Sequence, residues 1–295
     1  MHARAMTHFV SNGRRTGSPE SLSVPQKVKV LLTGVTVSKP VNRVTPDTLG
    51  LEFETHRFSG GAGELEAWFV PSGRPRGLIL MFHGYASCKS ELLREAAAFH
   101  ELGYATFLVD LRGSGGSSGF DTSVGVHEAN DVARACEYAT DKWPETPVIV
   151  FGESMGSVAV LRAISVHNLQ PRAVVLECPF DRLVSTVGNR FRTMGLPATP
   201  FTQLLVFWGG VQQGFNGFAH NPADYAKSVT VPALMLHGSG DTRVTLAQAE
   251  TIFENLSGRK QFDVFDGVGH ESFVARDAIR WKQLVGRFLL EPEHP

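Results

Sequence analysis

Short, continuous apolar runs and longer segments with helical spacing alternate along most of the chain. Residues 77–82 (GLILMF) form one such run, and apolar side chains recur every three or four positions in residues 155–166. Continuous runs of this length are typical of strands buried on both faces, and the second spacing is typical of helices. The alternation predicts an α/β fold, with a mostly parallel central sheet flanked by helices.

The same pattern places the individual elements. Strands are expected at residues 51–58, 64–70, 77–82, 104–110, 147–151, 173–177, 232–237 and 261–266. Helices are expected at residues 91–102, 126–142, 155–166, 246–256 and 271–290. The first two strands flank the glycine-rich turn SGGAG and are expected to pair as an antiparallel hairpin.

The alternation is interrupted at residues 179–225, after the sixth predicted strand. This segment is rich in Phe, Gly and Pro and has no strand signal, and its glycines and prolines interrupt the helical spacing. Long connections inside compact folds usually form lids or binding loops. We therefore expect a small cap inserted into a single domain that spans residues 28–295. Residues 1–27 are polar and are expected to form a mobile tail.

Composition excludes several classes of partner. The chain has 28 Lys and Arg against 29 Asp and Glu, so its net charge of −1 gives no field that would attract nucleic acid. The longest apolar runs have five residues, whereas a bilayer span needs about 20, so no integral membrane segment is expected. Three separated cysteines indicate neither a disulfide framework nor a zinc site. Without the apolar segment of a secretory signal near the N-terminus, a cytoplasmic protein is expected.

One serine has the surroundings of a nucleophile. The pattern G-x-S-x-G occurs around Ser154 (GESMG) and again around Ser117 (GGSSG). Only Ser154 follows a predicted strand directly and precedes a predicted helix directly, which is the context of a nucleophile elbow. A helix N-terminus there would favour developing negative charge. The alternative is that Ser154 merely caps the helix.

A serine nucleophile needs a base and an orienting carboxylate. His270 follows the last predicted strand, in the turn DGVGH, and Asp241 follows the strand before it, in the turn GSGD. Loops at the carboxyl ends of parallel strands gather catalytic groups in open α/β sheets. Ser154, Asp241 and His270 therefore form a candidate triad in the chain order Ser, Asp, His.

An oxyanion would also need backbone amide donors. Met155 follows the serine directly and supplies one amide, and Tyr85, after the strand at 77–82, is the candidate for the second. Gly84 is expected to allow the close approach of this loop. His83 is expected to order the loop by hydrogen bonding rather than to act as a base.

These residues resemble those of the α/β-hydrolase superfamily, specifically serine hydrolases related to monoacylglycerol lipases and the serine aminopeptidase-like group. The resemblance covers about residues 51–290, and its marks are FHGYA (82–86), VDLRGSGGSSG (109–119), GESMGS (152–157), LECPF (176–180), LHGSGDTRV (236–244) and GVGHESF (267–273). It implies Ser154 as nucleophile, Asp241 as acid and His270 as base, with the amides of Tyr85 and Met155 as oxyanion hole. It also implies a cap over the acyl pocket, and a structural loop that contains Asp110 and Arg112.

The expected activity is hydrolysis of a small-molecule carboxylic ester through an acyl-enzyme. Large apolar cap residues, among them Phe207 and Trp208, are expected to contact an apolar acyl group, and the short cap should limit substrates to short and medium acyl esters. A peptidase, a thioesterase or an acyltransferase with the same triad is an alternative, as is a non-catalytic binding protein. No metal or organic cofactor is expected, since HExxH, Walker and GxGxxG motifs do not occur.

Overall fold

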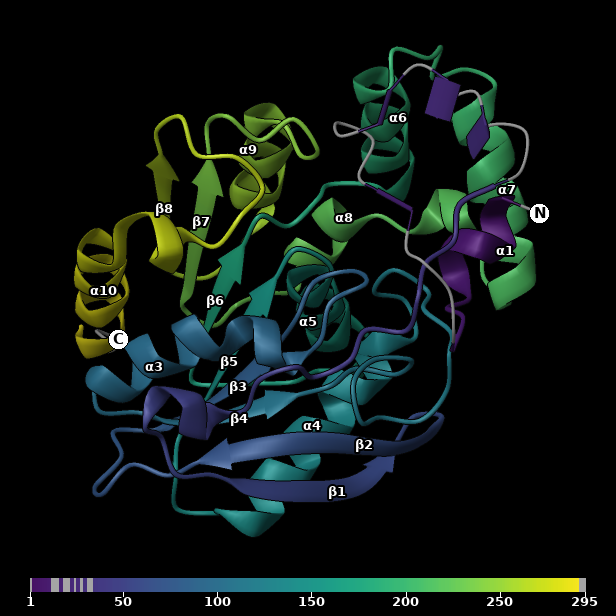
Figure 1. Ribbon diagram of the computed structural model, residues 1–295. Coiled ribbons are helices and arrows are strands. Elements are labelled where there is room, and N and C mark those ends of the chain that lie inside the picture. Colours follow the sequence, from purple (N-terminus) through teal and green to yellow (C-terminus); the bar gives the residue numbers. More distant parts are fainter. Residues whose placement is uncertain are drawn as a thin grey trace.

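A twisted central sheet organises the molecule (Figure 1). The computed structural model describes residues 2–11, 16–17, 22–23, 25–26, 29–30 and 34–291. Within these residues the sheet has eight strands: β1 (Glu54–Gly60), β2 (Gly63–Val70), β3 (Leu78–Phe82), β4 (Ala105–Val109), β5 (Val148–Glu153), β6 (Ala173–Glu177), β7 (Ala233–Gly238) and β8 (Lys260–Phe265). All eight lie where the hydrophobic pattern predicts them.

The strand order is β1-β2-β4-β3-β5-β6-β7-β8. The first two strands form the predicted antiparallel hairpin, β2 also pairs antiparallel with β4, and every later pairing is parallel. The register pairs Phe82 of β3 with Gly152 of β5, and Glu153 of β5 with Glu177 of β6. The loops that follow these strands therefore leave the sheet at one edge.

Helices cover both faces of the sheet and bury two separate cores. On one face α3 (Leu93–Glu101) and α10 (Phe273–Leu290) pack around Phe99, Phe151 and Trp281. The other face is covered by α4 (Glu128–Lys142), α5 (Met155–His167), α8 (Pro222–Ala226) and α9 (Leu246–Asn255). Short 3-10 turns lie at Pro46–Leu49, Lys89–Leu92 and Gly217–Ala219. This sandwich of layers confirms the predicted α/β class.

The two longest helices of the segment between β6 and β7 are α6 (Leu183–Thr193) and α7 (Phe201–Gln213). The sequence predicts that Gly209 and Gly210 interrupt the helical pattern here, but α7 continues through both. Gly210 instead allows close packing, because a Cβ there would lie 2.5 Å from the carbonyl oxygen of Phe215. The turn after α7 therefore packs closely on the helix.

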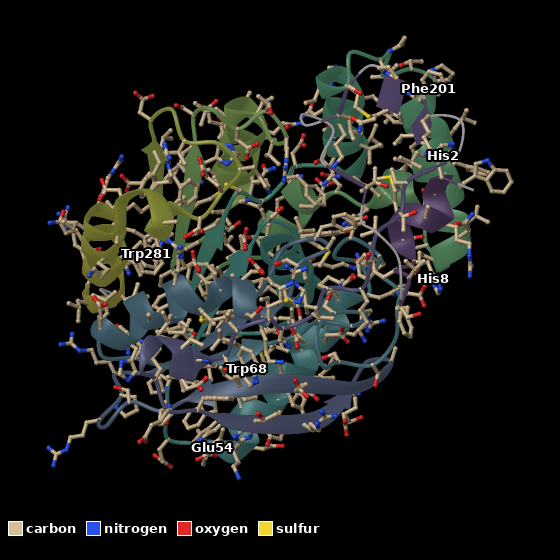
Figure 2. The ribbon with its side chains drawn as sticks, in the orientation of Figure 1. His2, His8, Glu54, Trp68, Phe201 and Trp281 are labelled. Carbon is tan, nitrogen blue, oxygen red and sulfur yellow. The ribbon has the colours of Figure 1, made fainter. Side chains whose placement is uncertain are left out.

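The N-terminal residues form a helix that packs on the segment between β6 and β7. Helix α1 (His2–Thr7) lies against α7, and Figure 2 shows His2 and Phe201 at the same end of the molecule. Just beyond α1, the amide of Phe9 donates to the carbonyl of Phe120 at 2.6 Å. This packing differs from the mobile tail predicted for residues 1–27, because Ala3 and Phe9 are buried. The remaining residues of that stretch are described only at isolated positions.

No helix among the described residues is long and apolar enough to span a bilayer.

Candidate active site

Ser154 occupies a strained turn between β5 and α5. Its backbone has φ +51° and ψ −111°, a conformation that is uncommon for a residue with a side chain. A Cβ at Gly152 would lie 2.5 Å from the amide nitrogen of Ser157, and one at Gly156 would overlap the carbonyl oxygen of Phe82. Both glycines of GESMG are therefore required for the chain to pack so closely. The Ser154 amide donates to the carbonyl of Glu177 at 2.7 Å, which fixes the turn to the end of β6.

His270 lies between Ser154 and Asp241. Its Nε2 is 2.9 Å from Oγ of Ser154, and its Nδ1 is 2.6 Å from Oδ2 of Asp241. The imidazole comes from the loop between β8 and α10, and its side chain is 14% exposed. In the sequence, His270 lies 29 positions from Asp241 and 116 positions from Ser154. The parallel sheet brings their loops together.

The carboxylate of Asp241 is held in place by donors on both oxygens. Oδ1 accepts the amides of Arg243 at 2.8 Å and Val244 at 3.0 Å, and Oδ2 faces His270. Burial alone would raise the pKa of Asp241, but the hydrogen bond and charge of His270 and the two amides outweigh it and lower the pKa below its ordinary value. Asp241 is therefore ionised at neutral pH and can orient and stabilise a protonated imidazole.

Met155 and the loop that contains Tyr85 both adjoin Ser154. Met155 is the first residue of α5, a position at which an α-helix offers no acceptor of its own to the amide. Tyr85 lies in the loop after β3, next to Gly84, where a Cβ would be 3.5 Å from the Cβ of Ser154. That distance is an ordinary van der Waals contact, so a methyl group fits at Gly84. The expected steric requirement for glycine at this position is not found.

The rival motif around Ser117 is structural. Ser117 is buried, its hydroxyl donates to the carbonyl of Asp110 at 2.6 Å, and it accepts the amide of Glu66 at 2.9 Å. His83 is also buried; its Nδ1 donates to the carbonyl of Gly84 and its Nε2 accepts the amide of Leu111. Burial lowers the pKa of His83, which keeps the imidazole neutral. Both residues order loops.

A buried ion pair that the sequence pattern does not predict lies near these loops. The Nζ of Lys89 is fully buried, contacts Asp110, and lies 2.8 Å from Oε1 of Glu66 and 4.4 Å from the Trp68 ring centre. Asp110 also accepts the Lys89 amide at 2.8 Å. The carboxylate of Asp110 therefore binds both the side chain and the backbone amide of Lys89. Nothing in the spacing of these residues along the sequence signals that they meet.

A cavity of about 590 Å³ lies between α6, α7 and the N-terminal residues. Trp208 lines it, whereas Phe207 does not and is 49% exposed. The two loops near Ser154 also reach it, through Tyr85 and Arg243. The N-terminal wall was not predicted; the hint for it was a few apolar residues, such as Ala3, Met6 and Leu22, in a mostly polar stretch.

Among the described residues, one group of side chains has metal-binding residue types. Ligand atoms of Cys178, His237 and Asp241 lie within 4.8 Å of one another. Burial, with the nearby carboxylates of Asp241 and Glu177, raises the pKa of the Cys178 thiol well above its ordinary value, and Asp241 is already occupied by His270 and two amides. A protonated thiol and an engaged carboxylate are poor ligands, so this donor set fits packing better than a metal.

Comparison with known proteins finds sequence similarity to the groups that the resemblance named. Residues 73–208 match the model of the serine aminopeptidase (S33) family. A monoacylglycerol lipase of Mycolicibacterium smegmatis is 24% identical over 256 residues, covering 74% of this chain and 90% of the lipase. An uncharacterized protein of Mycobacterium tuberculosis is 29% identical over 232 residues, covering 77% of this chain and 75% of that protein.

Solved structures share the architecture. An esterase of Pyrococcus furiosus superposes with a TM-score of 0.71 at 23% identity, over 85% of this chain and 95% of the esterase. An esterase of Exiguobacterium antarcticum gives a TM-score of 0.61 at 18% identity, over 81% of this chain and 100% of the esterase. Together with the topology, these matches show an esterase- and lipase-like protein with the α/β-hydrolase fold, similar in sequence to the serine aminopeptidase family and to a monoacylglycerol lipase.

Proposed function

We propose that the protein hydrolyses carboxylic esters with short to medium acyl groups, through an acyl-enzyme on Ser154. The observation that carries this proposal is the position of the His270 imidazole, 2.9 Å from Oγ of Ser154 and 2.6 Å from Oδ2 of Asp241. A hydroxyl at hydrogen-bond distance from an oriented imidazole can be deprotonated as it attacks a carbonyl carbon.

The reaction takes place in two halves. In the first, Oγ of Ser154 bonds to the ester carbon while Nε2 of His270 takes the hydroxyl proton, and the ester carbonyl oxygen becomes negative. The amides of Met155 and Tyr85 are the proposed donors to this oxyanion. Collapse of the intermediate breaks the bond to the alcohol oxygen, which receives the proton from His270. In the second half, water replaces the alcohol and releases the carboxylic acid and free Ser154.

Ester hydrolysis is favoured over aminopeptidase activity by the charge of the neighbouring cavity. Its charged lining residues, among those that the structure describes, are Arg190 and Arg243, and no carboxylate faces it there. A free α-amino group would need an anionic partner, whereas an acyl chain needs apolar walls. The monoacylglycerol lipase among the relatives supports an acyl ester as substrate.

Covalent labelling tests the proposal. A fluorophosphonate probe should label the wild-type protein and Ser117→Ala, and should fail to label Ser154→Ala. A panel of p-nitrophenyl esters, acyl thioesters and aminoacyl amides should then show the highest kcat/KM for esters. Labelling that persists in Ser154→Ala, or the absence of labelling in the wild type, would overturn the proposed mechanism, and a preference for amides or thioesters would replace the substrate class.

A further inference from the structure

The N-terminal helix lies at the boundary between two cavities. The large cavity is adjoined by a smaller one of about 70 Å³, and five residues line both: Ala3, Met6, Tyr85, Val187 and Leu205. Ala3 and Met6 belong to α1, and the other three come from the loop after β3, from α6 and from α7. A thin partition of side chains therefore separates the two spaces, and α1 supplies part of it.

The N-terminal residues build much of the large cavity. Of its twenty described lining residues, ten lie within residues 2–37, including Val35 and Val37. The opposite wall comes from α6 and α7, including Phe191 and Leu204. Apolar residues and one glycine make up the rest of the described lining beside His2, Thr16, Thr36, Tyr85, Arg190 and Arg243, and apolar walls are what a hydrocarbon chain requires.

Tyr85 joins this cavity to the reaction centre. Its hydroxyl donates to the carbonyl of Met6 at 2.6 Å, and its ring centre lies 6.2 Å from that of Phe9. The Arg190 guanidinium lies 5.4 Å from the same ring. The residue whose amide is the proposed oxyanion donor thus touches α1 through its side chain. A chain entering the cavity at Tyr85 would begin next to the ester carbonyl.

We propose that Ala3 and Met6 on α1 set the acyl length accepted by the cavity that they line together with α6 and α7. This inference rests on the proposed esterase function and adds the site and the residues that select the substrate. It assigns a role in specificity to a segment far from the triad in sequence. The smaller cavity behind the partition is the room that a larger chain would gain.

Substrate series with matched variants test the inference. For wild type, kcat/KM for p-nitrophenyl esters should rise by up to about fourfold per added methylene until the cavity is full, then level off. Met6→Ala should join the two cavities and move the plateau to longer chains, with roughly a three- to tenfold gain for the first esters beyond the wild-type plateau. Ala3→Leu should move it to shorter chains. Arg4→Ala, an exposed position on the same helix, is the matched control and should keep the wild-type profile.

The readout is the position of the plateau, because a loss of folded protein lowers turnover of every ester in the same proportion. Met6→Leu keeps the side-chain volume and should retain the wild-type profile. Unchanged plateaus in Met6→Ala and Ala3→Leu, with acetate still hydrolysed, would overturn the assignment while leaving the esterase function intact. A second series uses acetate esters of increasingly long alcohols. If the variants shift the plateau of kcat/KM in this series but not in the acyl series, the cavity binds the alcohol group and the acyl assignment is overturned. A wild type that is neither labelled at Ser154 nor active would end both proposals.

Discussion

The indole Nε1 of Trp281 donates a hydrogen bond to Oε1 of Glu177 at 2.6 Å, and both side chains are buried. Trp281 lies on α10, and the carbonyl of Glu177 accepts the amide of Ser154 and, at 3.0 Å, the hydroxyl of Ser157. The last helix is thereby tied to the strand end that holds the turn around Ser154. Burial raises the pKa of Glu177 well above its ordinary value, so its carboxyl group is favoured in the neutral form.

Removing the indole should cost more than changing the carboxyl group. Trp281→Phe leaves a buried oxygen without its donor and opens space in the core, so the free energy of unfolding should fall by about 3 kcal/mol. Glu177→Gln keeps an oxygen that can accept from the indole and should cost about 1 kcal/mol. Urea unfolding of the two variants measures both values. A loss in Glu177→Gln as large as that in Trp281→Phe would contradict this ranking.

Two aspartates, one in the loop after β4 and one in the loop after β7, should have separable roles. Asp241→Asn removes the charge that orients and stabilises protonated His270, and kcat should fall by about 10²–10⁴-fold in a folded protein. Asp110→Asn leaves the buried Lys89 with one fewer charged partner, so the free energy of unfolding should fall by about 3 kcal/mol while kcat per folded molecule changes little. Kinetics and urea unfolding on both variants decide; a folded but inactive Asp110→Asn beside an active Asp241→Asn would reverse the assignment.

Local signals explain why the loops around Ser154 could be predicted from the sequence. The strand before Ser154 and the helix after it follow from the local hydrophobic pattern, and Gly152 and Gly156 leave room for the turn between them. Parallel pairing then places the loops that contain Asp241 and His270 at the same edge. Residue type and local spacing were sufficient for these features.

Long-range contacts explain what the sequence did not reveal. Lys89 meets Asp110 across 21 positions, and Gln213 donates to the carbonyl of Thr7 across 206. In sequence, Lys89 looks like any exposed lysine, and α1 is a short helix with too few residues to be stable alone. Its conformation depends on packing against α7, which no pattern within residues 1–27 encodes.

Adjacent glycines in α7 offer a matched test of backbone packing. A Cβ at Gly209 meets nothing within 4 Å, so Gly209→Ala should stabilise the protein by about 1 kcal/mol through helix propensity. Gly210→Ala forces its methyl group against the carbonyl of Phe215 and the amide of Gly217, and it should destabilise by about 1–3 kcal/mol. Thermal unfolding compares them. Equal shifts in Tm would contradict the close packing of the turn on α7.

Two buried groups should give opposite dependences of stability on pH. Burial raises the pKa of Glu95 to about 7, so the stability it contributes is complete below the ordinary carboxyl pKa of about 4.3 and is lost as pH rises to 7. Burial lowers the pKa of His220 to about 4, so its contribution is complete above the ordinary histidine pKa of about 6.5 and is lost as pH falls to 4. Between about pH 4 and 7, the two groups therefore change the free energy of unfolding in opposite directions.

Single substitutions should separate the contributions of Glu95 and His220 to the pH dependence of stability. Subtracting the wild-type curve from that of Glu95→Gln should give a gain in unfolding free energy that grows towards pH 7, up to about 3 kcal/mol. The same subtraction for His220→Asn should give a gain that grows towards pH 4, of similar size. Urea unfolding across this pH range provides the curves. Two flat differences would mean that neither group titrates differently in the folded and unfolded chains.

Neighbouring aromatic residues on α7 should differ in their effect on substrate selection. Trp208 lines the large cavity although its side chain is half exposed, whereas Phe207 lies outside the lining and contacts the Trp208 ring edge at a centroid distance of 5.3 Å. The sequence could not separate them, because both fall in one apolar run. Trp208→Ala should enlarge the cavity and change kcat/KM for medium-chain esters by about tenfold relative to acetate, since a large apolar contact is lost. Phe207→Ala should shift that ratio by less than about twofold. Specificity constants for p-nitrophenyl acetate and octanoate measure the difference between the two variants. A larger effect from Phe207→Ala would place the acyl chain of the substrate on the outer face of α7.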